Sequence, residues 1–248
     1  MNLRIGTIVM LAGAALLLAG CDKKPSESPP IVGNVEGVTA PAGSDWTEKV
    51  IETAQGGYLL GNPNAPVRLV EYASLTCPHC SEFSRQASGP LRENYVKSGK
   101  VSWEFRPFAL NAIDVSASLL AMCQGPAPFF KLIEQTYLEQ EKWILPYQKF
   151  DQAVQQKLSA LPQGQQFVGL AREGGLDTFF RVRGLPSAKG EACLTDQKMI
   201  DRILAIRERG VKEDDVQGTP TFLINGVKVE QPPSWSGLEP ELKKALGA

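Results

Sequence analysis

Two cysteines separated by two residues stand near the end of the first third of the chain. Cys77 and Cys80 enclose Pro78 and His79, and His79 is the only histidine among the 248 residues. Cysteine pairs at this spacing hold metal ions, attach haem groups or form redox-active disulfides. Each use requires different neighbouring residues, so the surrounding sequence distinguishes between them.

The neighbouring residues disfavour haem and metal. A c-type haem requires a histidine directly after the second cysteine, and here Ser81 follows Cys80. A structural zinc site requires four Cys or His ligands, usually as two close pairs. The remaining cysteines near the middle of the chain, Cys123 and Cys193, are isolated. We therefore predict no metal and no bound cofactor, which leaves disulfide exchange.

The elements around the pair favour this chemistry. Residues 67–72 form an apolar strand pattern, and after Pro78 apolar residues recur at helical spacing. Proline suits the first helical turn because its missing N–H is not needed there. Cys77 then lies at a helix N-terminus, where free N–H groups and the helix dipole stabilise a thiolate. We predict Cys77 as the attacking thiol and Cys80, one turn later and more buried, as the resolving thiol.

His79 would influence the direction of exchange. Beside Cys77, the imidazole would donate a hydrogen bond to the thiolate or place a positive charge next to it. Stabilising the thiolate stabilises the reduced form and makes the disulfide a stronger oxidant. The alternative interpretation is an exposed residue at the start of a helix with no role.

The N-terminus has the parts of an export signal. Arg4 precedes an uncharged apolar run over residues 5–19, which is short for a spanning helix of about 20 residues. Leu-Ala-Gly before Cys21 resembles the lipobox of bacterial lipoproteins, in which the cysteine becomes the lipid-bearing N-terminus. The alternatives are an ordinary cleaved signal and an uncleaved anchor. All three place the rest of the chain outside the cytoplasm, where disulfides persist.

The rest of the chain divides into a tether and one folded domain. We predict a signal peptide over 1–20, a flexible tether rich in Pro, Ser and Gly over 21–44, and a domain over 45–248. Residue types at 45–54 favour a helix. Strand patterns follow at 57–60, 67–72, 100–108, 221–224 and 227–229, the last two joined by Asn-Gly. Helices are expected from residue 78, at 113–123, 127–140, 148–160, 166–173, 196–209 and 238–246.

This order predicts an α/β fold. A strand, a helix and a second strand joined by a right-handed crossover give a parallel pair, and the late hairpin adds antiparallel strands. The order resembles the thioredoxin-like fold with a helical insertion at about 112–210.

Two motifs resemble the DsbA family of periplasmic thiol:disulfide oxidoreductases. The stretch "VEYASLTCPHC" is similar to the family's strand, loop and active site, and "GTPTF" at 218–222 is similar to its X-Pro loop. The resemblance implies that Pro220 is cis and packs against the cysteine pair. It also implies that the Thr219 backbone pairs with an extended substrate peptide. Glu71 would be the family's buried acid and accept the proton of Cys80; the alternative is an outward-facing position.

One residue departs from the best-known oxidases. These carry an aliphatic residue before the cis proline, whereas Thr219 resembles isomerases and reductases. Dimeric isomerases also carry a sizeable N-terminal dimerisation domain, and the segment before Trp46 is too short and too polar for one. We therefore expect a monomer.

Cys123 and Cys193 remain once Cys21 is assigned to lipidation and Cys77 and Cys80 to redox chemistry. An even remainder in an exported protein favours a disulfide, and some DsbA relatives look similar. A Cys123–Cys193 bond would close a loop of about 70 residues and stabilise the fold by roughly 2–4 kcal/mol. The alternative is two buried free thiols.

The sequence thus favours a lipid-anchored dithiol oxidase on the periplasmic side of a bacterial membrane. It would oxidise unfolded exported proteins with free thiols and be reoxidised by a quinone-linked membrane partner of the DsbB type. Asp22 after Cys21 resembles an inner-membrane retention signal. A formal net charge of −1 gives no support for nucleic-acid binding. The alternatives are a reductase or isomerase, for example in cytochrome c maturation, and a non-catalytic lipoprotein that binds a partner.

Overall fold

The computed structural model describes residues 37–247. The predicted signal peptide, Cys21 and most of the predicted tether lie outside the described residues. Within 37–247, none of the helices combines the length and the apolar character needed to cross a bilayer.

Six strands form one mixed sheet in the order β1-β2-β4-β3-β5-β6. The two central strands, β3 and β4, run parallel, and every other neighbouring pair is antiparallel. Their bounds are Val50–Glu52 (β1), Tyr58–Leu60 (β2), Val67–Ala73 (β3), Val101–Pro107 (β4), Thr221–Ile224 (β5) and Val227–Lys228 (β6). The predicted parallel pair and late hairpin are confirmed, and Asn225 and Gly226 occupy the turn with φ of 51° and 84°.

The helix favoured at residues 45–54 is wrong. Asp45 caps a single 3₁₀ turn, η1 (Trp46–Glu48), and the chain then continues as strand β1. β1 pairs with β2, with Ile51 opposite Leu59. The hydrogen bonds offered by β2 outweigh the weak helical preference of these residues, as tertiary context commonly does.

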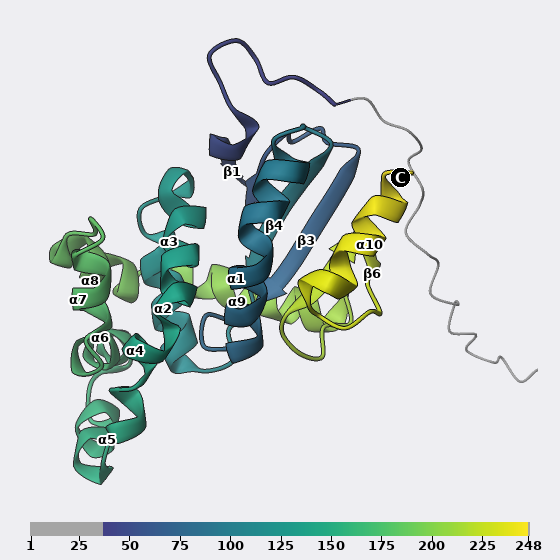
Figure 1. Ribbon diagram of the computed structural model, residues 1–248. Coiled ribbons are helices and arrows are strands. Elements are labelled where there is room, and N and C mark those ends of the chain that lie inside the picture. The colour runs from purple at the N-terminus through teal and green to yellow at the C-terminus, as the bar shows by residue number, and fades with distance from the viewer. Residues whose placement is uncertain (1–36, 248) are drawn as a thin grey trace, which may run out of the picture.

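The described chain enters the domain at the end of the sheet where β3 and β4 begin. The indole of Trp46 donates to the Val38 carbonyl oxygen at 2.7 Å. Gly37 and Val38 also lie against Ser98 and Gly99 in the turn before β4. Figure 1 shows this segment in purple, arching over that end of the sheet.

Helix α1 (Pro78–Pro90) connects β3 to β4 and continues as a π-helical stretch, η2 (Leu91–Val96). The change follows Pro90, which lacks the N–H that would continue the regular pattern. α1 buries Phe83 and Ala87 against the sheet. On the opposite face, Val70 and Tyr72 of β3 pack with Ile206 of helix α9 (Gln197–Lys212). The sheet is therefore covered on both faces.

The insertion between β4 and β5 is helical, as predicted, but contains more helices than the five expected. Before α9 it comprises α2 (Ala112–Met122), α3 (Pro126–Leu138), α4 (Gln140–Ile144), α5 (Gln152–Ser159), α6 (Gln163–Glu173), α7 (Leu176–Arg181) and α8 (Ser187–Thr195). The short α4 and α7 were missed because they span too few residues to show a helical period, and α8 was missed as well. The last helix, α10 (Trp235–Ala245), begins three residues earlier than predicted because Ser234 caps it.

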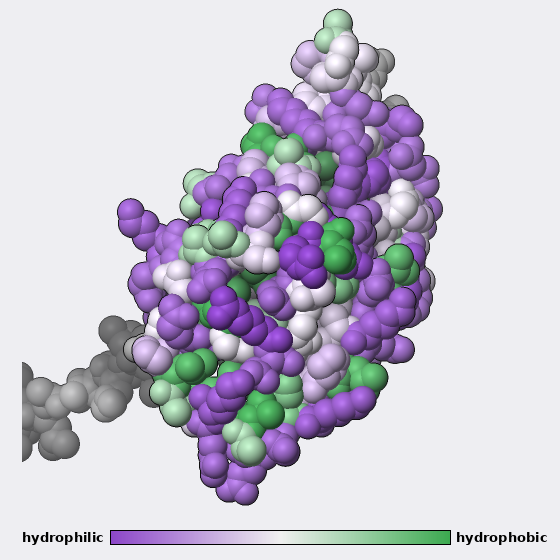
Figure 2. Space-filling view, turned by 90° about the vertical axis from the view of Figure 1, so that its left-hand side faces the viewer, coloured by the Kyte–Doolittle hydropathy of each residue, from purple (hydrophilic) through white to green (hydrophobic). Residues whose placement is uncertain are grey.

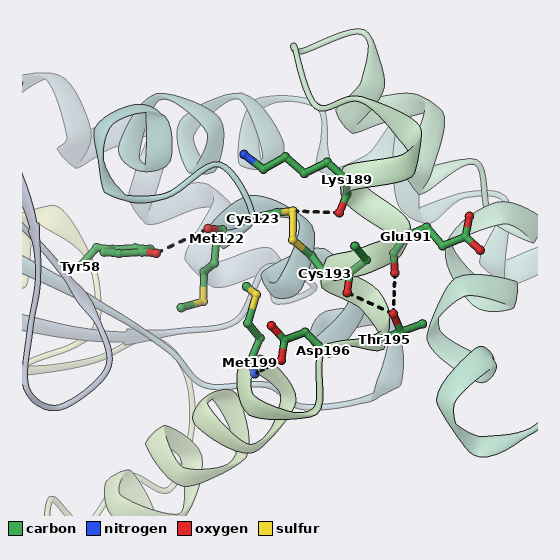
Figure 3. The surroundings of a disulfide bond; sticks show 10 residues. Tyr58, Met122, Cys123, Lys189, Glu191, Cys193, Thr195, Asp196 and Met199 are labelled. Atoms are coloured by element: carbon green, nitrogen blue, oxygen red, sulfur yellow. Dashed lines mark hydrogen bonds between the residues drawn. A yellow bond between two sulfur atoms is a disulfide. The ribbon is translucent and has the colours of Figure 1, made fainter.

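The insertion forms the teal and green part of Figure 1, beside the sheet. Figure 2 shows the side of the molecule on which the insertion lies, and its surface is mainly hydrophilic with hydrophobic side chains singly or in small groups. A disulfide joins Cys123, at the end of α2, to Cys193 of α8, with Cα atoms 5.8 Å apart. Figure 3 shows the bond linking the two helices. The predicted Cys123–Cys193 disulfide is confirmed.

Candidate active site

The cysteine pair lies where β3 ends and α1 begins. Cys77 is the N-cap residue of α1 in an extended conformation, and Pro78 is the first helical residue, as the sequence predicts. Both thiols are free; Cys77 is 7% exposed and Cys80 is fully buried. The more accessible cysteine is therefore the one at the helix N-terminus.

The surroundings of Cys77 favour its thiolate. A hydrogen bond from the Cys80 thiol is the main cause, and it outweighs burial, so that the pKa of Cys77 falls to about 5. The Thr219 side chain and the backbone N–H groups of Cys80 and His79 lower the pKa further. These N–H groups belong to the unpaired first turn of α1, which is the cause predicted from the sequence.

Cys80 behaves in the opposite way. Burial raises the pKa of its thiol well above its ordinary value, and the neighbouring Cys77 thiolate raises it further by accepting its hydrogen bond and by its charge. At neutral pH the pair therefore holds one thiolate, on Cys77, and one thiol, on Cys80. This is the division between attacking and resolving cysteine.

Glu71 lies inside the molecule near Cys80. β3 is flanked by β4 and β5, so the outward-facing alternative for Glu71 is wrong, and its side chain is 1% exposed. The Trp103 indole donates to a Glu71 carboxyl oxygen at 2.9 Å. Burial raises the pKa of Glu71 to about 8, although this hydrogen bond opposes the rise. The charge of Glu71 in turn raises the pKa of Cys80, so the two groups are coupled.

The X-Pro loop lies against the cysteine pair. The Thr219–Pro220 peptide bond is cis, as expected, and Pro220 is buried. The Cys77 thiol donates to the Thr219 carbonyl oxygen at 3.3 Å. The buried Thr219 hydroxyl is not engaged by any other group in the described part of the chain, so it is available to the Cys77 thiolate, whose pKa it lowers. This loop therefore presents both backbone and side-chain oxygen atoms to the attacking sulfur.

His79 does not take the predicted side-chain position. It is exposed, and within residues 37–247 its imidazole makes no hydrogen bond or ion pair; only its backbone N–H acts on Cys77. The side chain borders an open hollow that reaches Thr219 on its other side. The hollow is lined by His79, Glu82, Phe83, Gln86, Thr219, Pro232, Pro233 and Ser234.

The insertion contributes contacts that the sequence did not predict. Asp114 of α2 is fully buried and accepts from the Leu75 backbone N–H at 2.9 Å. Tyr137 of α3 donates to the Ser74 carbonyl oxygen at 3.1 Å. Gln140 of α4 reaches the same loop. Polar residues on helices are usually exposed, so nothing in the sequence marks these three as buried.

The described residues contain no cluster of three or more His, Cys, Asp or Glu side chains that could hold a metal ion. Within the site described above, the reactive atoms are the two free sulfur atoms, and the neighbouring groups set their protonation.

Comparison with known proteins agrees with this geometry. A family model described as thioredoxin matches residues 53–244. Among curated proteins, a putative protein-disulfide oxidoreductase of Rickettsia bellii is 28% identical over 173 residues, which cover 69% of this chain and 58% of that protein. The chain thus spans less than two thirds of the length of this relative.

Solved structures give the same result. A protein-disulfide isomerase from Novosphingobium aromaticivorans is 30% identical, with a TM-score of 0.72, and the match covers 77% of this chain and 97% of that one. Wolbachia pipientis alpha-DsbA1 is 24% identical, with a TM-score of 0.61, over 79% of this chain and 94% of that one, and shares the fold. The chain therefore belongs to the thioredoxin family, and it shares its fold with the solved DsbA protein.

Proposed function

We propose that this protein is a dithiol oxidase that donates a Cys77–Cys80 disulfide to exported proteins with free thiols. The observation that carries the proposal is the opposite shift of the two thiols, with the Cys77 pKa at about 5 and the Cys80 pKa well above its ordinary value. A stabilised Cys77 thiolate stabilises the reduced form. The corresponding disulfide is then a strong oxidant.

The reaction begins from the oxidised pair. A substrate thiolate attacks the Cys77 sulfur, the Cys77–Cys80 bond breaks, and its electron pair leaves on Cys80. The Cys80 thiolate takes up a proton, for which the buried Glu71 carboxyl is a suitable donor because its pKa is about 8. The product of this step is a mixed disulfide between Cys77 and the substrate.

A second substrate thiolate then attacks the substrate sulfur of the mixed disulfide. Cys77 departs as a thiolate, and its low pKa makes it a good leaving group. The substrate loses two electrons and gains a disulfide, while the enzyme pair is reduced. An extended substrate peptide would pair with the backbone of Thr219, whose carbonyl already lies beside the Cys77 sulfur.

The sequence also suggests where in the cell the reaction takes place. We propose export by residues 1–20, a lipid on Cys21, a tether over 21–44 and a catalytic domain over 45–248, held as a monomer at the periplasmic face of the inner membrane. A quinone-linked partner of the DsbB type would reoxidise the pair. The Cys123–Cys193 disulfide supports an oxidising compartment, because such bonds seldom persist in the cytoplasm.

A reductase or isomerase is the second candidate. Thr219 before the cis proline favours it, as does the similarity to the structure named a protein-disulfide isomerase. A non-catalytic lipoprotein is the third.

The redox equilibrium distinguishes these candidates. The full chain would be equilibrated in detergent with glutathione mixtures, and the oxidised fraction of Cys77–Cys80 measured by thiol alkylation. An oxidase gives a potential near that of DsbA, about −120 mV, whereas a value near the −270 mV of thioredoxin would contradict the oxidase assignment. Oxidation of a reduced test protein that persists in the Cys77→Ala variant would contradict catalysis by this pair.

A further inference from the structure

Gln140 connects the helical insertion directly to the attacking cysteine. It is the first residue of α4, and its side chain is 5% exposed. The amide nitrogen donates to the Leu75 carbonyl oxygen at 2.8 Å and to the Cys77 carbonyl oxygen at 2.9 Å. One buried amide group thus joins the two carbonyls on either side of Thr76.

The Cys77 carbonyl oxygen accepts a second hydrogen bond. It also accepts the Ser81 backbone N–H at 3.2 Å, which is the first hydrogen bond of α1. Its direction therefore fixes how the first turn of α1 is oriented relative to the Cys77 side chain. The N–H groups that lower the Cys77 pKa, those of His79 and Cys80, lie in that turn. A group that holds the Cys77 carbonyl also holds the alignment between the sulfur and these donors.

Other insertion residues hold the loop at different points. Tyr137 contacts the Ser74 carbonyl and Asp114 contacts the Leu75 N–H. Among the hydrogen bonds from the described part of the insertion, one of the two made by Gln140 reaches the Cys77 backbone itself. These two bonds are buried. If the Gln140 amide is removed, water cannot take its place at the two carbonyls, so the loss costs free energy.

We propose that Gln140 is a positioning residue for thiol–disulfide exchange: by binding the Leu75 and Cys77 carbonyls it orients the Cys77 thiolate, so that the insertion sets the redox equilibrium of the site. This proposal deepens the proposed function and rests on it. It predicts that loss of the amide weakens thiolate stabilisation without altering either cysteine.

The test replaces Gln140 by Met, which has nearly the same length and no donor. Gln124→Leu is the matched control, because Gln124 also lies in the insertion and donates to a backbone carbonyl, that of Arg183, at 3.4 Å. The full-length proteins are compared by the pH dependence of thiolate absorbance, by equilibrium with glutathione and by the free energy of unfolding.

In Gln140→Met we expect the Cys77 pKa to rise and the glutathione equilibrium to move about threefold to tenfold toward the disulfide, as loss of one or two such bonds would give. The control should match the wild type in both. If Gln140→Met lowers stability but leaves the thiolate titration and the equilibrium unchanged, the role is structural and the proposal is wrong.

A milder variant guards against a failure to fold. Gln140→Asn keeps the amide but is one methylene shorter, so it cannot reach both carbonyls, and a partial change in the same direction is expected. An Asn variant with wild-type titration would also overturn the proposal. The Gln140 variants are each compared with the wild type, whereas the proposed oxidase function is tested by the redox potential of the wild type itself. The two proposals can therefore fail independently.

Discussion

The thiol of Cys77 lies 3.3 Å from the carbonyl oxygen of Thr219, although 142 positions separate the two residues in the sequence. The antiparallel pairing of β3 with β5 brings them together, since Tyr72, near the end of β3, stands opposite Thr221, the first residue of β5 after the X-Pro loop. The central sheet therefore sets the geometry of the site, and neighbouring groups set the protonation of its thiols. Changes in pH or in these groups should alter the stability of the protein and the redox equilibrium of the pair.

The reduced protein should become more stable relative to the oxidised protein as pH rises. The Cys77 pKa is about 5 when folded and near 9 ordinarily, so the unfolded reduced chain binds one more proton between these values. Its unfolding free energy then gains up to ~1.4 kcal/mol per pH unit, a contribution complete above pH 9 and lost below pH 5. Glu71 and Asp114 are present in both redox forms, so their contributions to the pH dependence of unfolding largely cancel when the two forms are compared.

Denaturant unfolding of the two redox forms, measured from pH 5 to pH 9, checks this expectation. A difference between the forms that does not change with pH would show that the Cys77 thiolate is not stabilised.

Two buried glutamates on neighbouring strands should respond oppositely to substitution by Gln. Burial raises the Glu71 pKa to about 8, so its contribution to stability is present below pH 4.5 and is lost as pH rises through 8. Glu71→Gln should remove this loss and stabilise the oxidised protein by up to ~5 kcal/mol at pH 9 relative to the wild type.

Glu104 provides the comparison. Burial alone would raise its pKa, but the hydrogen bonds and charge of Arg106, the Thr53 hydroxyl and the charge of Arg68 together outweigh burial, and the pKa lies below its ordinary value. Glu104→Gln should destabilise the protein by about 3 kcal/mol, because the buried Arg106 guanidinium loses its buried carboxylate partner and keeps only the ion pair with the partly exposed Asp214. Equal effects of the two substitutions on unfolding would contradict these assignments.

Thr219→Val should weaken the Cys77 thiolate. It removes the hydroxyl that lowers the Cys77 pKa while keeping the side-chain shape. We expect the pKa to rise and the glutathione equilibrium to move about threefold toward the disulfide. Thr219→Ser retains the hydroxyl and should stay close to the wild type; similar behaviour of the Val and Ser variants would exclude the hydroxyl as the cause.

Removing the insertion disulfide should affect stability alone. The Cys123→Ala/Cys193→Ala double variant loses a bond that joins residues 70 positions apart, and its unfolding free energy should fall by roughly 2–4 kcal/mol. The Cys77–Cys80 equilibrium with glutathione should remain unchanged, because neither cysteine contacts the catalytic loop. A shifted equilibrium would indicate that the bond also tunes the redox pair.

The sequence predicted those parts of the site that local chemistry specifies. The Cys-Pro-His-Cys turn and the Asn-Gly hairpin each require particular residues at fixed spacing, so they are visible without a structure, whereas the cis Pro220 loop was expected from the resemblance to the DsbA family. Asp114, Tyr137 and Gln140 were not predictable, because their burial results from how α2, α3 and α4 pack against the loop. β1 was missed for the same reason, since its strand conformation depends on pairing with β2.

The point at which the chain enters the domain has a consequence for access to the site. The described chain enters where β3 and β4 begin, and Cys77 follows the far end of the seven-residue β3, about 23 Å away along the strand. If Cys21 carries the proposed lipid, the tether would join the domain at the end of β3 opposite the reactive sulfur. Soluble substrates would then meet Cys77 directly, whereas a membrane-embedded partner would require the whole domain to turn over on its tether.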